Sequence, residues 1–324
     1  MYSGNSKNKK TILVIDSANI YSNGVYDWIA NKVTSLEEPF LKNILKLQER
    51  FFPDMIVLLN DKDKSRYRME INPEYKNNRV KAKEKAVKSK KAKEIQAEEL
   101  RKKLKKNLHL FSETGLFING EVRQVEADDV LGMLYNDERL KDYNIIGVTQ
   151  DKDLMTVLPF DKIYDWSKER FKTLEDRHNL TQSQFLGFQA LQGDSTDNIK
   201  GLEGVGEGTA LKIINHFGSL GAFIRNEGQD IEHSCWRVKK ANKMMQEPET
   251  LKSLKQSYLQ VKIMKNTDLL NSYEKEDYER IVKDILCYNP LKEHILSNDL
   301  DMYLLENSMN SYELLEQIQE FQSC

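Results

Sequence analysis

The stretch Val125-Glu126-Ala127-Asp128-Asp129-Val130 places three carboxylates within four residues, between apolar neighbours. The chain continues with Leu131, Met133 and Leu134, a spacing typical of a helix that turns one face to a core. We therefore expect a buried helix to begin at the carboxylates. Like charges beside apolar surface repel each other and lose hydration, which is unfavourable unless a cation joins them. A solvated helix start is the alternative interpretation, because acidic residues favour helix N-termini.

The composition is that of a charge-rich globular protein, long enough for two domains. Of the 324 residues, 39% are hydrophobic and 31% are charged, and no run approaches the ~18 apolar residues of a membrane helix. The apolar run at residues 11–15 is too short for the core of a signal peptide. Three scattered cysteines, Cys235, Cys287 and Cys324, argue against a disulfide framework and for a reducing cytoplasm. No Cys or His spacing indicates a zinc site.

The net charge of −2 conceals two segments of opposite sign. Residues 79–106 hold thirteen Lys/Arg against four Glu, and residues 268–320 hold thirteen Asp/Glu against four Lys/Arg. The composition of the basic segment favours helix, but its apolar residues are sparse before Leu100. It is therefore either a solvated helix or a segment that orders on a polyanion. The acidic segment is either a cap over the core or a protein-binding segment.

Three short apolar runs, at residues 11–15, 55–59 and 144–149, indicate buried strands, and residues 162–165 indicate a weaker fourth. Helical spacing, as at Phe40, Ile44 and Leu47, separates the first two, and this alternation implies an α/β fold with a parallel sheet. Ligands of such sheets bind beyond the carboxyl ends of the strands. Acidic residues follow three of these strands, namely Asp16, Asp61, Asp151 and Asp153. Together with the Glu126 cluster, they predict a basin for cations.

A further acidic pair and a glycine-rich loop follow a helical stretch near residue 190. Asp194 and Asp197 have a spacing that shares one face of a helical turn. Residues 201–208 (GLEGVGEG) then hold four glycines and open a helix expected to run to about Phe217. Backbone N–H groups at a helix N-terminus bind phosphate, and glycines allow close approach. A dinucleotide-binding loop is excluded because a helix precedes it, and a Walker A loop because Gly-Lys-Ser/Thr is missing. Residues 240–324 are expected to be mainly helical.

These features resemble the flap endonuclease family of 5′-nucleases, especially its bacteriophage 5′-3′ exonucleases (the phage RNase H-like members) and the 5′-nuclease domain of bacterial DNA polymerase I. The resemblance extends from Leu13 to about Phe217 and includes six motifs in order. They are residues 15–16, Asp61 with 73–79 (PEYKNNR), 125–129 (VEADD), 149–153 (TQDKD), 192–199 (QGDSTDNI) and 201–208. Six motifs in the right order are highly specific, whereas any one alone would be weak.

The resemblance implies an α/β fold, a PIN-like parallel central sheet flanked by helices. A helical arch would lie at about residues 79–108, and a helix–two-turn–helix DNA-binding element, similar to a helix-hairpin-helix, around residues 201–214. The expected organisation is a disordered tail at 1–10, a nuclease core at 11–190, a DNA-binding region at 191–265 and an acidic helical segment at 266–324.

The resemblance also implies two Mg²⁺ ions, for which Mn²⁺ can substitute, and a K⁺ ion at the glycine loop. Lys76 and Arg79 would face the scissile phosphate. Tyr75 would either stack on a terminal base or pack in the core, and Asp63 remains an alternative to Asp61. The first ion would be held by Asp16, Asp61, Glu126 and Asp128, and the second by Asp151, Asp153 and Asp197, with Asp129 and Asp194 acting through water. The expected DNA contacts are Tyr75, Lys81, Lys83, Lys85 and Lys88, followed by Gly201, Gly204, Gly206, Gly208, Thr209 and Lys212.

The implied function is a structure-specific, metal-dependent 5′-nuclease of phage DNA replication, with 5′-3′ exonuclease, 5′-flap endonuclease and RNA-primer-removing activity. Its substrates would be flaps, nicks and RNA·DNA hybrids, and its products would carry a 5′-phosphate. The chain would act as a monomer in the bacterial host cytoplasm, with a single-strand-binding or clamp protein as partner. Two alternatives are a catalytically inactive branched-DNA-binding protein and a PIN-type RNA nuclease. The complete carboxylate set argues against the first, and the glycine loop and chain length against the second.

Overall fold

The computed structural model describes residues 9–18, 20, 25, 38–81, 96–97, 99–102, 117–225 and 236–288. A six-stranded sheet lies at its centre, in the order β3-β2-β1-β4-β5-β6. All neighbouring strands are parallel except β5 and β6, which are antiparallel. The four predicted strands are confirmed, whereas β3 and β6 have only two residues each and show no periodicity. The strands are β1 (Thr11–Asp16), β2 (Met55–Leu59), β3 (Ile118–Asn119), β4 (Asn144–Val148), β5 (Ile163–Asp165) and β6 (Arg170–Phe171).

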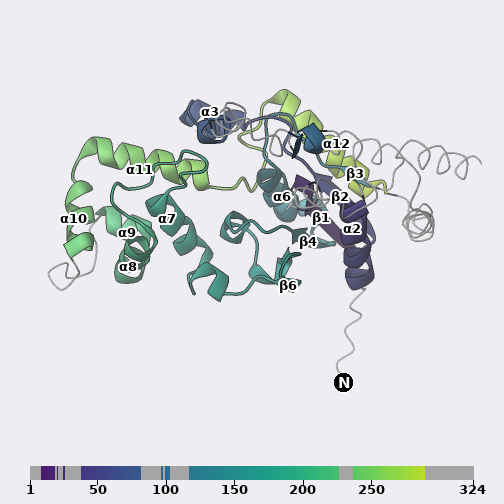
Figure 1. The fold of residues 1–324 in the computed structure, drawn as a ribbon, viewed down its shortest axis with the longest axis horizontal. Helices are drawn as coiled ribbons and strands as arrows, with labels where there is room; N and C mark the ends of the chain where they lie inside the picture. Colours follow the sequence, from purple (N-terminus) through teal and green to yellow (C-terminus); the bar gives the residue numbers. More distant parts are fainter. Residues whose placement is uncertain are drawn as a thin grey trace, which may run out of the picture.

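The central strands are buried on both faces, which explains why their sequences are continuously apolar rather than alternating. Ile12 and Val14 of β1 belong to the core that contains the apolar residues of α6 (Ala127–Asn136). Leu13 and Ile15 belong to a second core, shared with α2 (Glu38–Phe51). The sheet therefore lies between α6 and α2 (Figure 1).

A group of helices lies to one side of the sheet, on the left in Figure 1. It consists of α7 (Gln182–Gln192), α8 (Glu207–Phe217), α9 (Leu220–Arg225), α10 (Trp236–Met244) and α11 (Pro248–Val261). α11 packs against α7 and against α3 (Arg66–Ile71), and α12 (Ser272–Leu286) then contacts β3. The predicted change to a helical chain after residue 180 is confirmed. Four short 3-10 helices lie between α6 and α7, namely η1 (Glu138–Leu140), η2 (Asp153–Thr156), η3 (Phe160–Lys162) and η4 (Glu175–Arg177).

Two of the helix starts follow a clear sequence signal. The side chain of Thr181 accepts a hydrogen bond from the Gln184 backbone N–H at the start of α7, and the side chain of Gln184 accepts one from the Thr181 backbone N–H. Asn271 and Glu274 form the same reciprocal arrangement at the start of α12. Each pair satisfies two backbone donors that the helix itself leaves unpaired.

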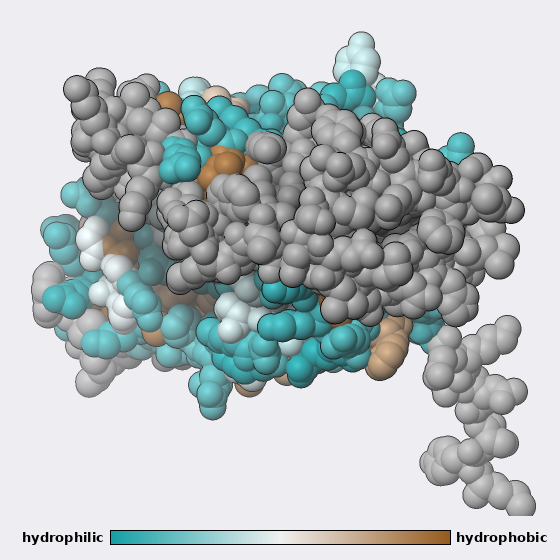
Figure 2. Space-filling view, turned by 45° about the vertical axis from the view of Figure 1, so that its right-hand side comes forward, coloured by the Kyte–Doolittle hydropathy of each residue, from teal (hydrophilic) through white to brown (hydrophobic). Residues whose placement is uncertain are grey.

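On the face shown in Figure 2, the visible described residues are mostly hydrophilic, with scattered hydrophobic side chains. Among these residues, no helix is long and apolar enough to span a bilayer. Cys287 is exposed and carries a free thiol. Most of the predicted arch lies outside the described residues, including Lys83, Lys85 and Lys88, and so does the acidic segment after residue 288.

Candidate active site

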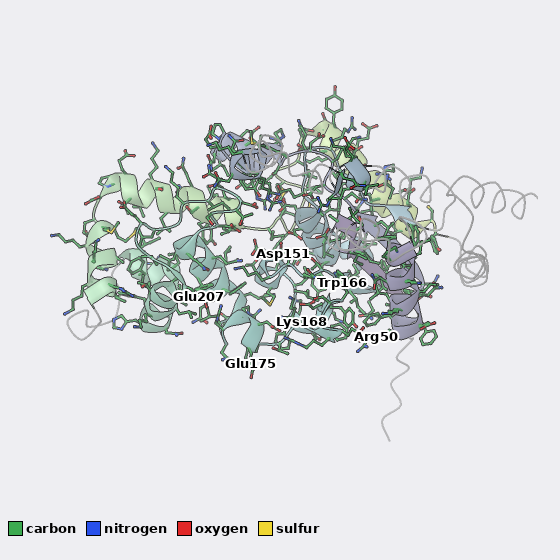
Figure 3. All side chains as sticks on the ribbon, viewed as in Figure 1. Arg50, Asp151, Trp166, Lys168, Glu175 and Glu207 are labelled. Carbon is green, nitrogen blue, oxygen red and sulfur yellow. The ribbon has the colours of Figure 1, made fainter. Side chains whose placement is uncertain are left out.

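The carboxyl ends of β1, β2 and β4 meet at one edge of the sheet, because these strands are parallel neighbours. Asp16 is the last residue of β1, and its Oδ2 accepts a hydrogen bond from the Thr149 hydroxyl at 3.5 Å. The same hydroxyl accepts from the Asp151 backbone at 3.1 Å, and Asp151 Oδ1 accepts from the Asp153 backbone at 2.8 Å. The strand ends thus bring Asp16, Asp151 and Asp153 together. Asp151 lies between the sheet and the group of helices (Figure 3).

The start of α6 adds further carboxylates to this edge, and the prediction that a helix begins there is confirmed. Glu126 is the residue before the first helical position, and its side chain makes no capping hydrogen bond. The Ala127 backbone N–H instead donates to Asp61 Oδ1 at 2.8 Å. Asp61 therefore contacts the start of α6, although both Asp61 and Asp63 are exposed. The positive end of the helix dipole favours acidic residues at these positions.

The Asp128 carboxyl is affected by the charges of several other acidic residues of the site. Burial, and after it the charges of Asp151 and Asp16, raise the pKa of the Asp128 carboxyl well above its usual value. Its Oδ1 is shielded from solvent and has no hydrogen-bond partner among the described residues. Burial and the neighbouring Asp151 likewise raise the pKa of Asp153 to about 8. A buried carboxylate in such surroundings ionises readily only when a cation compensates its charge.

The carboxylates of the site are too far apart to coordinate one common metal ion as they stand. Within the described ranges, no three of them are close enough to form a ready-made metal site. They nonetheless act on one another, since Asp16, Asp61, Asp151 and Asp153 all raise the pKa of Asp128. All donors are oxygens, which favours a hard cation, and Mg²⁺ in particular retains several waters and needs few direct carboxylates. The residues present therefore fit Mg²⁺ ions bound partly through water.

Two positively charged side chains from the segment after α3, those of Lys76 and Arg79, lie among these carboxylates. Lys76 Nζ donates to Glu126 Oε1 at 2.5 Å and lies 3.8 Å from Asp61 Oδ2. Arg79 Nη2 lies 2.5 Å from Asp197 Oδ1. Burial opposes ionisation of Glu126, but Arg68 and Lys76 together hold its pKa below the usual value. The two side chains predicted to face the scissile phosphate are thus paired with site carboxylates in this structure.

Asp197 reaches the site because two loops are hydrogen-bonded to each other. The Lys76 backbone N–H donates to the Asp197 carbonyl at 2.9 Å. Asn72 Nδ2 donates to the Asn198 carbonyl at 3.1 Å, and Asn198 Nδ2 donates to the Glu74 carbonyl at 3.0 Å. Asp194 Oδ1 accepts from the Thr196 backbone at 2.7 Å and so shapes the turn that carries Asp197.

Tyr75 belongs to the core. Its ring is only 2% exposed, so it offers no face on which a base could stack. Its hydroxyl donates to Glu126 Oε2 at 3.0 Å and lies 3.3 Å from Asp197 Oδ2. Of the two roles predicted for Tyr75, the structure supports the core role and contradicts base stacking. The hydroxyl positions Glu126.

Asp129 is placed differently from the prediction that it acts on metal through water. It is fully buried, and its carboxylate forms a two-point ion pair with Arg68, including Arg68 Nη2 to Asp129 Oδ1 at 3.1 Å. The Met264 backbone also donates to Oδ1 at 2.9 Å. Both oxygens are therefore taken by protein donors. Sequence reasoning missed Arg68, because one arginine in the charged stretch at residues 61–68 carries no signal of burial.

The glycines of the loop at residues 201–208, together with the preceding Gly193, fall into a tightly packed group and an open group. Gly193 and Gly201 have φ values of 70° and 66°, and a Cβ on either would come within about 2.6 Å of the other's backbone. By contrast, a Cβ at Gly204, Gly206 or Gly208 would meet nothing within 4 Å. The prediction of a helix after this loop is confirmed by α8, which ends at Phe217. Among the predicted DNA contacts, Gly201 and Thr209 are buried, whereas Gly204, Gly206, Gly208, Lys81 and Lys212 are exposed.

We expect the free energy of unfolding, measured in EDTA, to fall as the pH rises from about 4 to about 8. Asp153 has a pKa of about 8 in the folded chain and about 3.9 when unfolded. The folded state therefore binds the Asp153 proton more tightly than the unfolded state does. The stability that protonated Asp153 contributes is fully present below the pKa of the unfolded chain and is lost as the pH rises through the pKa of the folded chain.

Urea unfolding at several pH values tests this expectation. Asp153→Asn should make the decline shallower, whereas Asp63→Asn, at an exposed position, should leave it unchanged. A wild-type stability that is constant or rises over this range would contradict the expectation.

Two family descriptions match consecutive parts of the chain, from residue 11 to residue 281. Residues 11–184 match the family described as 5′-3′ exonuclease, N-terminal resolvase-like domain, and residues 180–281 match 5′-3′ exonuclease, C-terminal SAM fold. DNA polymerase I of Lactococcus lactis subsp. cremoris is 27% identical over 240 residues, which are 68% of this chain and 26% of the polymerase. The chain thus spans about a quarter of that relative's length.

Phage proteins match over more of their length. The flap endonuclease of Escherichia phage T5 is 28% identical over 225 residues, which are 65% of this chain and 72% of the phage protein. The fold is also similar to that of a T5 5′-exonuclease structure with bound zinc ions. That similarity has a TM-score of 0.65 at 23% identity and covers 86% of this chain and 98% of the other.

Proposed function

Because this chain belongs to the 5′-3′ exonuclease family, we propose that it hydrolyses phosphodiester bonds of branched or 5′-ended DNA with the aid of divalent metal ions. The observation that carries the proposal is the Asp128 carboxylate. Its Oδ1 is buried without a hydrogen-bond partner among the described residues, and burial and the acids at the strand ends raise its pKa. A cation would relieve both conditions. A T5 flap endonuclease structure at 23% identity is a pseudo-enzyme–product complex with DNA and metal ions.

Two Mg²⁺ ions, when bound, supply an activated water and neutralise charge at phosphorus and on the leaving oxygen. We assign Asp194 to a contact through water, because its Oδ1 already accepts two backbone hydrogen bonds. Asp129 is left out of the ligand set, because Arg68 and Met264 occupy its oxygens. The first ion would be held by Asp16, Asp61, Glu126 and Asp128, and the second by Asp151, Asp153 and Asp197.

Lys76 and Arg79 would change partners when substrate and cations enter. Without them, Lys76 neutralises Glu126 and Arg79 neutralises Asp197. Once the carboxylates hold cations, both side chains become available to the oxygens of the scissile phosphate, where negative charge develops. Tyr75 would keep Glu126 in place through its hydroxyl, whichever partner Glu126 has.

The DNA would be held by phosphate contacts rather than by base edges. The exposed Gly204, Gly206 and Gly208 leave the backbone around the N-terminus of α8 open, and Lys212 is exposed one turn later. Such a site suits the phosphates of a duplex, and a K⁺ ion could join them. The basic residues 79–106 would receive a single-stranded 5′ end by charge. Cleavage would therefore depend on DNA structure rather than on sequence.

The chain would act in phage DNA replication, where it would also remove RNA primers, and its similarity to a flap endonuclease of Escherichia phage T5 supports the phage setting. The chain would act as a monomer on flaps, nicks and RNA·DNA hybrids, with a single-strand-binding or clamp protein as partner, and would leave 5′-phosphates.

End-labelled flap, nicked and RNA·DNA substrates, incubated with Mg²⁺ or with EDTA, test this function. We expect cleavage near the branch point of the flap only with Mg²⁺, and a ligatable 5′-phosphate on the product. Tight binding without cleavage in either Mg²⁺ or Mn²⁺ would indicate an inactive branched-DNA-binding protein. Cleavage restricted to RNA strands would indicate an RNA nuclease.

A further inference from the structure

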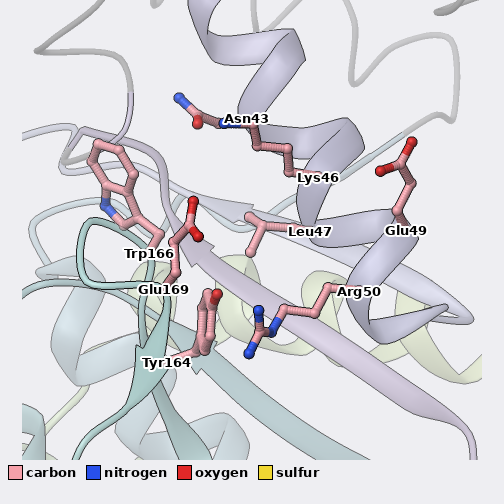
Figure 4. Close-up of a pocket in the computed structure, with 8 residues that line it drawn as sticks. All are labelled: Asn43, Lys46, Leu47, Glu49, Arg50, Tyr164, Trp166 and Glu169. Atoms are coloured by element: carbon pink, nitrogen blue, oxygen red, sulfur yellow. The ribbon is translucent and has the colours of Figure 1, made fainter.

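A pocket of about 430 Å³ lies between α2 and the end of β5, away from the carboxylates. Its two walls face each other across an open space (Figure 4). The helix contributes Asn43, Lys46, Leu47, Glu49 and Arg50, and the opposite wall consists of Tyr164, Trp166 and Glu169. We call it the α2–β5 pocket. Its volume is in the range of small-ligand sites.

The aromatic wall of the pocket is fixed by packing. The Tyr164 ring meets the Phe51 ring edge-on at 4.9 Å between centroids and the Phe171 ring at 5.5 Å. The Arg50 guanidinium lies over the Tyr164 ring, 5.1 Å from its centroid. Trp166 stands beyond Tyr164 on the same wall (Figure 4). A flat heteroaromatic ring could stack on Trp166 without disturbing this packing.

The charged groups of the pocket are not matched to one another. Lys46 and Glu169 line the same space, and so does Arg50, yet none of the three forms an ion pair or hydrogen bond with any described side chain. A ligand that joins a flat ring to an anion would use these three, whereas the fourth charged residue of the lining, Glu49, points away from Trp166 (Figure 4). The ring would lie against Trp166, an exocyclic amino group would donate to Glu169, and the anion would meet Lys46 and Arg50. A nucleotide has this combination, whereas an apolar peptide side chain would leave the charges unpaired.

The aromatic wall is also connected to the strand end that carries the carboxylates. The Thr149 backbone donates to the Tyr164 carbonyl at 3.1 Å. Between Tyr164 and Trp166, Asp165 Oδ2 accepts from Lys172 Nζ at 2.9 Å. Lys172 Nζ also donates at 3.0 Å to the carbonyl of Gln150, the residue before Asp151. The pocket and the carboxylate basin are therefore linked by these hydrogen bonds.

We propose that the α2–β5 pocket binds one unpaired nucleotide of the DNA substrate, with its base on Trp166 and its phosphate at Lys46 and Arg50. The assignment of DNA as the source rests on the proposed function. The Glu169 carboxylate accepts hydrogen bonds but cannot donate them. The pocket therefore prefers cytosine, which carries an exocyclic amino group, over thymine, which carries a carbonyl oxygen at that position.

A nucleotide titration in EDTA tests the pocket without any cleavage. The probe is deoxycytidine 5′-monophosphate, and the signal is the Trp166 indole N–H resonance of ¹⁵N-labelled protein, identified with Trp166→Phe. We expect a saturable shift, at least about fivefold weaker binding of thymidine 5′-monophosphate because one hydrogen bond is lost, and less discrimination in Glu169→Gln. Lys46→Met should weaken binding, whereas Lys42→Met, one turn earlier on α2 and outside the pocket, should not.

Several outcomes would overturn the proposal. One is an unchanged Trp166 signal at 10 mM nucleotide, roughly ten times the Kd expected of so small a ligand, as would follow if a partner protein occupied the pocket. Another is an equal response to deoxyribose 5-phosphate, which would reduce the site to an anion site. None of these outcomes depends on cleavage, so the proposed pocket can fail while the proposed nuclease function stands. The nucleotide titration likewise remains interpretable if the cleavage assay fails.

A second experiment tests whether the nucleotide in the pocket belongs to the DNA substrate or is a free nucleotide. Asp128→Asn protein is bound to branched DNA with either one unpaired cytidine or one abasic residue at the junction. We expect several-fold tighter binding of the cytidine substrate and loss of this difference in the additional variant Lys46→Met. Equal affinities would overturn the assignment to DNA.

Discussion

Asp128→Asn is expected to reduce Mg²⁺-dependent cleavage of a 5′-flap substrate by roughly 10³-fold, comparable to removing a key electrostatic group from other active sites. An amide cannot neutralise a cation, and it presents one oxygen where the carboxylate presents two. Binding of flap DNA in EDTA should remain, because the raised pKa of Asp128 leaves little negative charge at this position for the substitution to remove when no cation is present. Single-turnover cleavage and fluorescence anisotropy measure the two effects separately.

The same substitution should stabilise the fold when metal is absent. The raised pKa of Asp128 means that the folded chain disfavours the charged form of this carboxyl. Asparagine carries no charge in either the folded or the unfolded state, so it avoids this cost. Loss of activity together with a gain of stability in EDTA would separate a functional carboxylate from a structural one. Asp63→Asn is the matched control, since Asp63 is exposed on the loop that also carries Asp61. Full Mg²⁺-dependent cleavage by Asp128→Asn would reject the proposed site.

Much of this edge of the sheet could be predicted from the sequence, because the signals are local. A continuous apolar run identifies a buried strand, and parallel pairing then brings the residues after each strand to one edge. Asp16, Asp61 and Asp151 follow such runs, and the structure places them there. The start of α6 follows from helical spacing after Glu126. None of these inferences required knowledge of a long-range side-chain contact.

The remaining features depend on contacts between distant segments. The burial of Arg68 requires the carbonyl of Gln260, 192 residues away, as an acceptor. Whether Tyr75 faced a base or the core depended on where residues 194–198 pack against it. The α2–β5 pocket also joins segments more than a hundred residues apart. Apolar periodicity contains no information about such pairings, and a charged residue gives no sequence signal that it will be buried.

Arg68→Met is expected to lower the free energy of unfolding by about 3–5 kcal/mol, the range for breaking a buried ion pair by removal of one partner. Methionine fills much of the space of the arginine stem but donates no hydrogen bond. Asp129 would then remain buried, with only the Met264 backbone as donor, and the carbonyls of Gln260 and Lys262 would lose theirs. Urea unfolding at neutral pH measures the change.

The matched control for this loss is Arg139→Met. Arg139 also pairs with carboxylates, Asp137 and Glu279, but it is 43% exposed, so its removal should cost less than about 1 kcal/mol. Asp129→Asn should destabilise the chain as Arg68→Met does, while Mg²⁺ affinity stays close to that of the wild type. If Asp129→Asn instead weakened Mg²⁺ binding as strongly as Asp128→Asn and left stability unchanged, Asp129 would belong to the metal site after all. The buried ion pair would then not be what holds α6 against α3 and the segment after α11.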